Sequence, residues 1–301
     1  MLSVRSIYPI IIPQITFIDT FQQANSYVEM NPSMSIDPTG KVTILVRCVN
    51  YRKFHDKKYT CYKPYPNSLY YILSGRIDNG VHLDINSFTV EKLIDHNTLP
   101  RYPTYWLGME DIRMIDSHSV LVTIPECNEH GNPSIFRALL NDHLIHSFQE
   151  CYPNQTEKNW MPFTNKEGHT RVIYSLNPFI IKEVDSDDMT TLSLSPSMVD
   201  QLHGYHGSTN GVPYEDNSFL FLIHINKERT YHRWLIMGQD SIRISDEFVI
   251  FRYSYIEFPV SLCKWENRLF ISMGVNDDKA FIIETDMDQV NTRSFTQESV
   301  R

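Results

Sequence analysis

The sequence predicts an all-β protein, a single five-bladed β-propeller. Three observations predict this fold: five apolar runs with the length of buried strands, a polar motif ahead of each run, and a regular interval between runs. After a longer first interval the runs recur roughly every 50 residues, as expected for a four-stranded blade repeated around an axis. The runs are Lys41 to Arg47, Ser119 to Pro125, Thr170 to Leu176, Ser218 to Ile225 and Arg268 to Gly274.

The polar motifs lie where the innermost strand of each blade is expected, roughly 8 to 12 residues before the apolar run. Innermost strands of all blades face one axis, so we expect these side chains to converge on an axial funnel. The motifs are Asn31-Pro32-Ser33, Glu110-Asp111-Ile112-Arg113, Glu157-Lys158-Asn159-Trp160, His206 to Asn210, and Glu257-Phe258-Pro259.

The chain of 301 residues shows no Gly/Ser or Pro-rich linker, so we expect one domain over residues 1–301. Residues 1 to about 24 precede the repeat and are predicted to form an N-terminal extension. Residues from about 51 to 65, rich in Tyr and Lys, lengthen the first interval and are predicted to form an insertion in the first blade. This insertion is either a solvated hairpin or a segment that overhangs the funnel.

Charge and cysteine content narrow the functional classes. The net charge is −9 and no basic stripe is present, which argues against nucleic-acid binding. The apolar N-terminal stretch is too short and too interrupted by Pro for a membrane span. The five Cys lack CxxC spacing and indicate reduced thiols in a cytoplasmic protein. The His pairs lack carboxylates at ligand spacing, so no metal site is predicted.

The segment Leu107 to Arg113 (LGMEDIR) resembles the G-x-E-D-[PA]-R signature of glycoside hydrolase family 130, five-bladed propellers that act on β-mannosides. The chain is also similar to glycosyltransferase family 108, whose members build and phosphorolyse β-1,2-mannosides. The resemblance covers residues from about 25 to 285. Its other segments follow in the family's order: Asn31-Pro32-Ser33 with Arg47, Glu157 to Phe163, Gly207 to Pro213 with Phe221 to His224, Tyr231 to Arg233, and Ile256 to Phe258 with Gly274 to Asp277.

The resemblance implies a carbohydrate-active enzyme that cleaves or transfers a β-linked mannosyl or similar hexosyl residue with inversion. Asp111 is the implied general acid. We expect partial burial and a nearby negative charge to raise its pKa. Glu110 is expected on the opposite side of the strand, because successive side chains alternate.

The attacking group is phosphate, water or an acceptor sugar. Inorganic phosphate is a candidate co-substrate and needs a cluster of cations, for which we assign Arg113, Lys158, His224, Tyr231 and Arg233. Water instead needs a base about 6.5–9.5 Å from Asp111, for which Glu157, Glu257 and Asp277 are candidates. The predicted substrate-binding residues are Asn31, Arg47, Glu110, Asn159, Asn210, Glu257 and Asp277.

Two departures from the resembled pattern favour an alternative function. Ile112 stands where the phosphorylases carry Pro, and Ser175 to Pro178 stands where they carry an Arg that helps to hold phosphate. The alternative is a catalytically inactive glycan-binding propeller. In either case the expected partner is an oligosaccharide or a sugar phosphate, and no cofactor is predicted; a homo-oligomer is compatible with the sequence.

Overall fold

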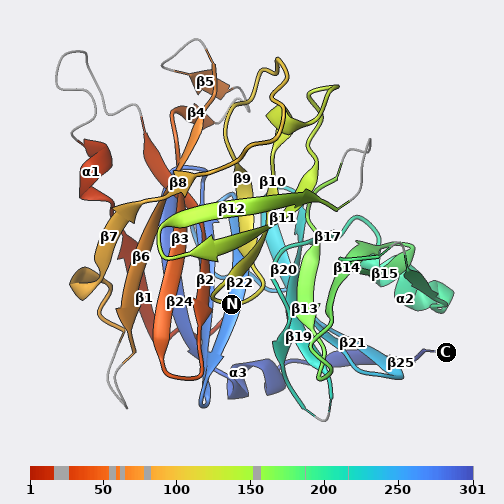
Figure 1. Ribbon diagram of the computed structural model, residues 1–301. Coiled ribbons are helices and arrows are strands. Elements are labelled where there is room, and N and C mark those ends of the chain that lie inside the picture. The colour runs from red at the N-terminus through yellow and green to blue at the C-terminus, as the bar shows by residue number, and fades with distance from the viewer. Residues whose placement is uncertain are drawn as a thin grey trace.

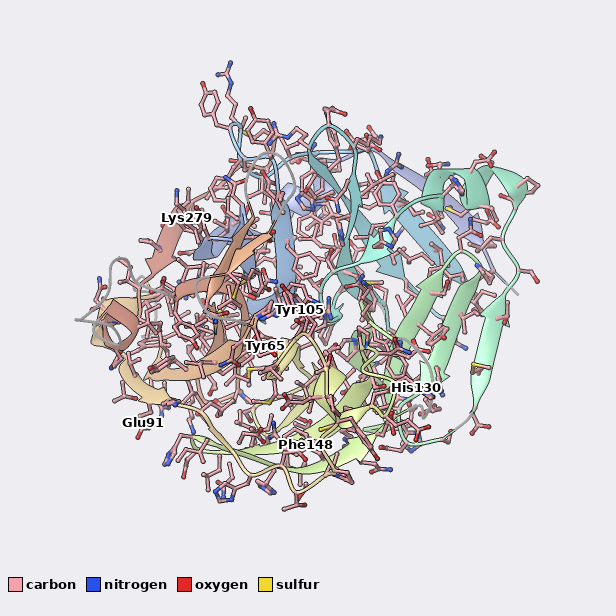
Figure 2. All side chains as sticks on the ribbon, turned by 90° about the horizontal axis from the view of Figure 1, so that it is seen from above. Tyr65, Glu91, Tyr105, His130, Phe148 and Lys279 are labelled. Carbon is pink, nitrogen blue, oxygen red and sulfur yellow. The ribbon has the colours of Figure 1, made fainter. Side chains whose placement is uncertain are left out.

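The computed structural model describes residues 1–16, 27–53, 59–61, 65–77, 83–151, 157–186, 188–215 and 217–300. Five small sheets, antiparallel apart from one short parallel pairing in the second, surround a central axis, so the predicted five-bladed β-propeller is confirmed (Figure 1). Figure 2 looks down on the propeller and shows the blades arranged around the axis.

The blades follow one another in chain order, and in each the chain runs outward from the axis; the outermost strands of blades 2, 4 and 5 are added from other parts of the chain. Blade 1 contains β2 (Val28–Ile36), β3 (Lys41–Val49), β6 (Ser68–Arg76) and β7 (Thr89–Lys92); blade 2 contains β9 (Glu110–Met114), β10 (Ser119–Thr123), β11 (Ile135–Asn141), β12 (Leu144–Glu150) and β8 (Ile94–Asp95); blade 3 contains β13 (Met161–Thr164), β14 (Thr170–Leu176), β15 (Phe179–Glu183) and β16 (Met189–Leu192); blade 4 contains β17 (His206–Gly207) and β18 (Val212–Pro213), both paired with β19 (Phe219–Asn226), then β20 (Thr230–Met237), β21 (Ser241–Ser245) and β25 (Phe295–Ser299); blade 5 contains β22 (Glu257–Trp265), β23 (Arg268–Val275), β24 (Lys279–Asp286) and β1 (Ser6–Ile10).

Helices are short and peripheral in the described parts of the chain. They are α1 (Pro13–Thr16), α2 (Pro196–Leu202), α3 (Asp288–Asn291) and the 3₁₀ turns Ile85–Ser87 and Pro125–Cys127. No helix there is long and apolar enough to cross a lipid bilayer.

The five apolar runs form the second strand of each blade: β3, β10, β14, β19 and β23. Both faces of these strands are covered by neighbouring blades, and β10 is buried along its whole length. A strand buried on both faces needs a continuous apolar sequence. This explains why these runs gave the clearest signal in the sequence.

Neighbouring blades are joined at the axis by serine side chains. Met34 N in β2 donates to Ser261 Oγ in β22 at 2.8 Å. Met114 N in β9 donates to Ser33 Oγ in β2 at 2.9 Å. These bonds satisfy buried backbone donors that face another blade, so the inner strands are held in a fixed relation to one another.

The chain ends supply outer strands. β1, from the segment expected as an N-terminal extension, pairs with β24 in the register Ser6 to Glu284. β25 pairs with β21 in blade 4. Each pairing covers a strand edge that would otherwise be open to solvent.

The insertion in blade 1 contains a two-stranded sheet, β4 (Tyr51–Lys53) with β5 (Tyr59–Cys61), which stands at the top of blade 1 in Figure 1. Residues 54–58 and 62–64 of this segment lie outside the described residues. Tyr51 is buried, and its ring meets that of Trp106 with the centroids 5.2 Å apart. The start of the insertion is therefore packed against the loop that precedes β9.

Candidate active site

A cavity of about 400 Å³ opens among the inner strands, and we call it the axial cavity. Its volume lies in the range of small-molecule sites. Tyr65 and Tyr105, which belong to segments beside it, lie near the centre of the view in Figure 2. The cavity is lined by Met30, Asn31, Arg47, Tyr51, Trp106, Glu110, Asp111, Pro125, Gly131, Pro133, Lys158, Ile256, Phe258 and Asp277.

Four polar residues of the axial cavity form one connected group. Asp111 Oδ1 accepts hydrogen bonds from Asn31 Nδ2 and from Arg47 Nη1, both at 3.0 Å. Arg47 Nη2 donates to Glu110 Oε1 at 2.8 Å, and its Nε donates to Ser68 Oγ at 3.0 Å. The Arg47 guanidinium is buried and donates from each of its three nitrogens, so it fixes both carboxylates in place.

Glu110 and Asp111 lie on the same side of their strand, so the expected alternation was wrong. The register between β9 and β10 shifts between Leu121 and Thr123, where one extra residue of β9 is accommodated as a β-bulge. Asp111 has φ +43°, in the left-handed region. This turn rotates consecutive side chains toward the same guanidinium.

Asn31 has the same local geometry one blade earlier. Its φ is +42°, and the pairing of β2 with β3 shifts register between Met30 and Ser33. Gly274 permits this arrangement, because a Cβ at that position would lie 2.1 Å from Asn31 Oδ1. Asn31 Oδ1 is buried and has no hydrogen-bond partner in the described structure.

The pKa of Asp111 is lowered, not raised as the sequence had suggested. Burial raises this pKa, but the charges of Arg47 and Arg113 and the hydrogen bonds from Asn31 and Arg47 outweigh it. Asp111 is therefore an ionised carboxylate at neutral pH in the ligand-free protein. Its side chain is 26% exposed, so a ligand in the cavity has access to it.

Arg113 and His224 lie behind Phe258, a wall residue of the axial cavity. The Arg113 guanidinium is 5.8 Å from the Phe258 ring centroid, and its Nη2 is buried without a hydrogen-bond partner in the described structure. The His224 ring lies 5.3 Å from that of Phe258, and its Nδ1 is 2.6 Å from Ser208 Oγ. Burial, followed by His232, His206 and Arg113, lowers the pKa of His224 to about 3. His224 is therefore neutral and adds no positive charge for phosphate.

Lys158 and Asn159 border a second cavity of about 500 Å³. We call it the blade 3–4 cavity, because it opens between β14 and β17. Lys158 is exposed and lines both cavities, whereas Asn159, with φ +64°, lines only the second. The other lining residues are Met161, Ile173, Tyr174, Ser175, Leu176, Asn177, His203, Gly204, Tyr205, His206 and Gly207.

Tyr231 and Arg233 lie apart from Asp111, so the five predicted phosphate residues do not form one cluster. Both are in β20, two strands out from the axis, a displacement of about 10 Å at the usual strand spacing. Arg233 Nε donates to Tyr205 Oη at 2.7 Å, and Tyr231 donates to Glu228. Tyr231 and Arg233 lie on the strand that follows the apolar run of blade 4. Strand order alone places that strand further from the axis than the apolar run.

Glu257 and Asn210, predicted to bind substrate, have structural contacts instead. Glu257 is buried and accepts hydrogen bonds from His232 Nε2 at 2.9 Å and from the backbone N–H groups of Ile250 and Phe251. Asn210 uses both ends of its amide on the backbone of Leu262, at 3.0 and 2.8 Å, and so joins blade 4 to blade 5. Neither residue lines the axial cavity.

Among the three candidate bases, Asp277 alone lines the axial cavity. Glu157 is buried and accepts from Trp160 Nε1 at 3.0 Å and from Tyr174 Oη at 2.8 Å. Trp160 is itself buried between blades, so it packs rather than stacks on a ligand. In the described part of the chain, no group of three or more His, Cys, Asp or Glu is placed to hold a metal ion.

The sequence analysis missed an aromatic series beside the cavity. Trp106 contacts Tyr51 and Tyr105, with centroid distances of 5.2 and 5.6 Å, and Tyr105 lies 6.4 Å from Tyr65. Aromatic rings with polar neighbours are typical of ligand sites. The signal was present in the sequence, because Tyr102 to Trp106 directly precedes the motif that contains Asp111.

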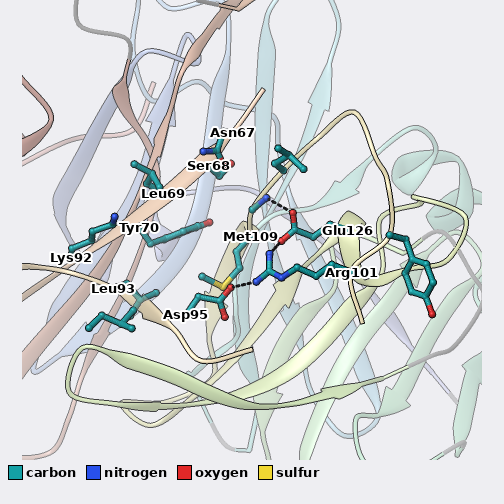
Figure 3. Close-up of a pocket in the computed structure, with 14 residues that line it drawn as sticks. Asn67, Ser68, Leu69, Tyr70, Lys92, Leu93, Asp95, Arg101, Met109 and Glu126 are labelled. Atoms are coloured by element: carbon teal, nitrogen blue, oxygen red, sulfur yellow. Dashed lines mark hydrogen bonds and ion pairs between the residues drawn. The ribbon is translucent and has the colours of Figure 1, made fainter. Parts of the chain in front are cut away.

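A third cavity, of about 640 Å³, lies between blades 1 and 2 beside the turn that leads into β9 (Figure 3). At one end of this cavity Arg101 forms ion pairs with Glu126 and with Asp95. The distance between Arg101 and Asp95 is 2.8 Å. Glu126 Oε2 also accepts from Gly108 N at 3.1 Å. Gly108 has φ +83°, and a Cβ there would lie 2.4 Å from Ser68 O. Glu126 therefore fixes the tight turn that leads into Glu110 and Asp111.

We expect Glu126→Ala to lower the free energy of unfolding by about 1–3 kcal/mol, because the Gly108 N–H loses its acceptor. Affinity for a glycan in the axial cavity should fall with it. Glu126→Gln should recover part of both losses, since an amide oxygen still accepts from Gly108. Urea denaturation and glycan titration measure these effects. Glu129→Ala, at an exposed ion pair, is the control and should change stability by less than about 0.5 kcal/mol; equal effects of the two alanine variants would contradict the role of Glu126.

Comparison with known proteins gives matches in structure only. No protein-family model and no curated protein sequence matches the chain. Among solved structures, the β-1,2-mannobiose phosphorylase of Listeria innocua, in complex with β-1,2-mannobiose, aligns over 95% of this chain and 98% of its own, with 12% identity and a TM-score of 0.58. A glycosyl hydrolase from Bacteroides ovatus aligns over 86% of this chain and 84% of its own, with 12% identity and a TM-score of 0.53.

These likenesses establish a shared fold. The protein is a five-bladed β-propeller with a polar cavity at its axis. In fold it resembles the mannoside phosphorylases, as the sequence motifs around Asp111 had indicated.

Proposed function

We propose that the protein is a carbohydrate-active enzyme that cleaves or transfers a β-linked mannosyl residue, with Asp111 as the catalytic acid. The observation that carries this proposal is the group formed by Asn31, Arg47, Glu110 and Asp111 at the wall of the axial cavity. The shared fold with a mannobiose phosphorylase supports the choice of sugar.

The ionised state of Asp111 is consistent with this role if the ligand changes its surroundings. A bound sugar excludes water from the carboxylate and raises its pKa, because the charged form is then less well solvated. The protonated Asp111 carboxyl then donates its proton to a sugar hydroxyl, and that hydroxyl passes its own proton to the departing glycosidic oxygen.

The surrounding charges favour attack by water or by an acceptor sugar over attack by phosphate. Among the described residues, Arg47 and Lys158 are the cations that line the axial cavity, and Arg47 is occupied by two carboxylates. Lys158 remains for an incoming dianion, against the charge of Asp277 on the same cavity. Asp277 is the candidate base that activates water.

A second candidate function is glycan binding without catalysis. The lowered pKa of Asp111 and the dispersal of the predicted phosphate residues favour it. Both functions require a sugar in the axial cavity, so they differ in turnover rather than in ligand.

Incubation with β-1,2-, β-1,3- and β-1,4-mannobiose, with and without inorganic phosphate, tests the proposal. We expect release of mannose that does not depend on phosphate, and NMR should show the α-anomer first, as inversion requires. Formation of mannose 1-phosphate would instead establish phosphorolysis. Binding of a mannoside without turnover would support the glycan-binding function.

A further inference from the structure

The axial cavity and the blade 3–4 cavity adjoin at Lys158, which lines both. The second cavity is bounded by the end of β14 and by the segment from His203 to Gly207 that enters blade 4. Its volume of about 500 Å³ exceeds that of the axial cavity. The second cavity is therefore the neighbouring space on the side of the axial cavity that faces blades 3 and 4.

Several polar side chains line the blade 3–4 cavity without a hydrogen-bonding partner inside the described part of the protein. Each is exposed or half-buried, and in the described structure none makes a side-chain hydrogen bond or ion pair. They are Lys158, Asn159, Ser175, Asn177, His203 and His206. By contrast, the polar side chains around Asp111 are bound to one another. A ligand can therefore hydrogen-bond to these side chains without breaking any hydrogen bond within the protein.

Two tyrosine rings of the same cavity are held in fixed positions. Tyr174 donates to Glu157 at 2.8 Å, and its ring packs on Trp160 with a centroid distance of 5.6 Å. The Tyr205 hydroxyl donates to Glu247 at 2.6 Å and accepts from Arg233 at 2.7 Å. Fixed aromatic rings combined with unused amides, a hydroxyl and imidazoles suit a ligand with apolar faces and many hydroxyls, which is the chemistry of a sugar.

We propose that the blade 3–4 cavity binds the outer units of an oligosaccharide whose reacting end lies in the axial cavity. The substrate is then a chain of three or more sugars rather than a disaccharide. This inference rests on the proposed function, since it assumes a sugar beside Asp111. Asn159 and Lys158 contact the chain where it passes from one cavity to the other, and Asn177 and His206 contact its outer units.

Calorimetric titration of the whole protein with β-1,2-manno-oligosaccharides of two, three, four and five units tests this inference. We expect affinity to rise with length, by about tenfold from two units to four, and then to level off. Equal affinity at all lengths would overturn the inference and leave the proposed function intact. If no length binds, the proposed function fails, and the inference fails with it.

A paired variant locates the contacts. We expect Asn177→Ala combined with His206→Ala to reduce the affinity for four units to that for two. The control is His118→Ala combined with Asn141→Ala, two exposed blade 2 residues that line neither cavity, and it should keep the full dependence on length. Circular dichroism checks that both variants fold. A paired variant that keeps the length dependence would overturn the inference.

Inorganic phosphate is added as a competitor, and loss of the length dependence on its addition would assign the cavity to an anion instead.

Discussion

Asp111→Asn is expected to lower kcat/KM on a β-mannoside by about 10²- to 10⁴-fold, the usual contribution of a general acid. The asparagine Oδ1 still accepts from Asn31 and Arg47, and Arg47 keeps its contact with Glu110. The melting temperature should therefore change by no more than about 2 °C. Steady-state kinetics and thermal unfolding measure the two effects.

Glu110→Gln is the matched comparison, because Glu110 binds the same guanidinium 2.8 Å away but is not assigned a proton. If Asp111 acts only by holding Arg47, both variants should lose similar activity. If Asp111 transfers the proton, Asp111→Asn should lose far more. Retention of wild-type turnover by Asp111→Asn would exclude it as the acid.

Glu257→Ala is expected to lower the free energy of unfolding by about 3–5 kcal/mol, the cost of removing one partner from a buried charged network. Glu257 is buried, and its carboxylate accepts from His232, from Ser254 and from two backbone N–H groups, with Arg229 nearby. All these donors would lose their acceptor together. Urea denaturation at pH 7 measures the loss.

The pH dependence of this loss provides a second test. Hydrogen bonds and charges overcome burial and lower the pKa of Glu257, so its folded pKa lies below that of an unfolded Glu, about 4.3. Its stabilising contribution is therefore complete above that value and is lost as the pH falls through the folded pKa. The difference between wild type and Glu257→Ala should narrow from pH 7 to pH 3. A difference that is constant over this range would contradict the ionic role.

The contrast between Glu257 and Asp111 bears on how the site is built. Both carboxylates were predicted to contact substrate, and both have a lowered pKa. Glu257 is enclosed by donors from its own and neighbouring blades, whereas Asp111 has a partly exposed face toward the axial cavity. Exposure to the cavity therefore distinguishes Asp111, which a ligand can reach, from Glu257, which it cannot.

The sequence by itself determined the five blades, because strands buried on both faces require continuous apolar runs such as Leu220 to Ile223. It also placed Asn31, Glu110 and Asp111 near one another, since inner strands of a propeller share an axis. These inferences depend only on periodicity and strand order.

Tertiary structure alone decided the direction and charge of each side chain. The bulge at Asp111 turned it toward the same guanidinium as Glu110, and that guanidinium lowered its pKa. Burial left His224 neutral, and strand position took Arg233 away from the axis. Such outcomes depend on distances between segments far apart in the chain, and a local pattern of residue types does not contain those distances.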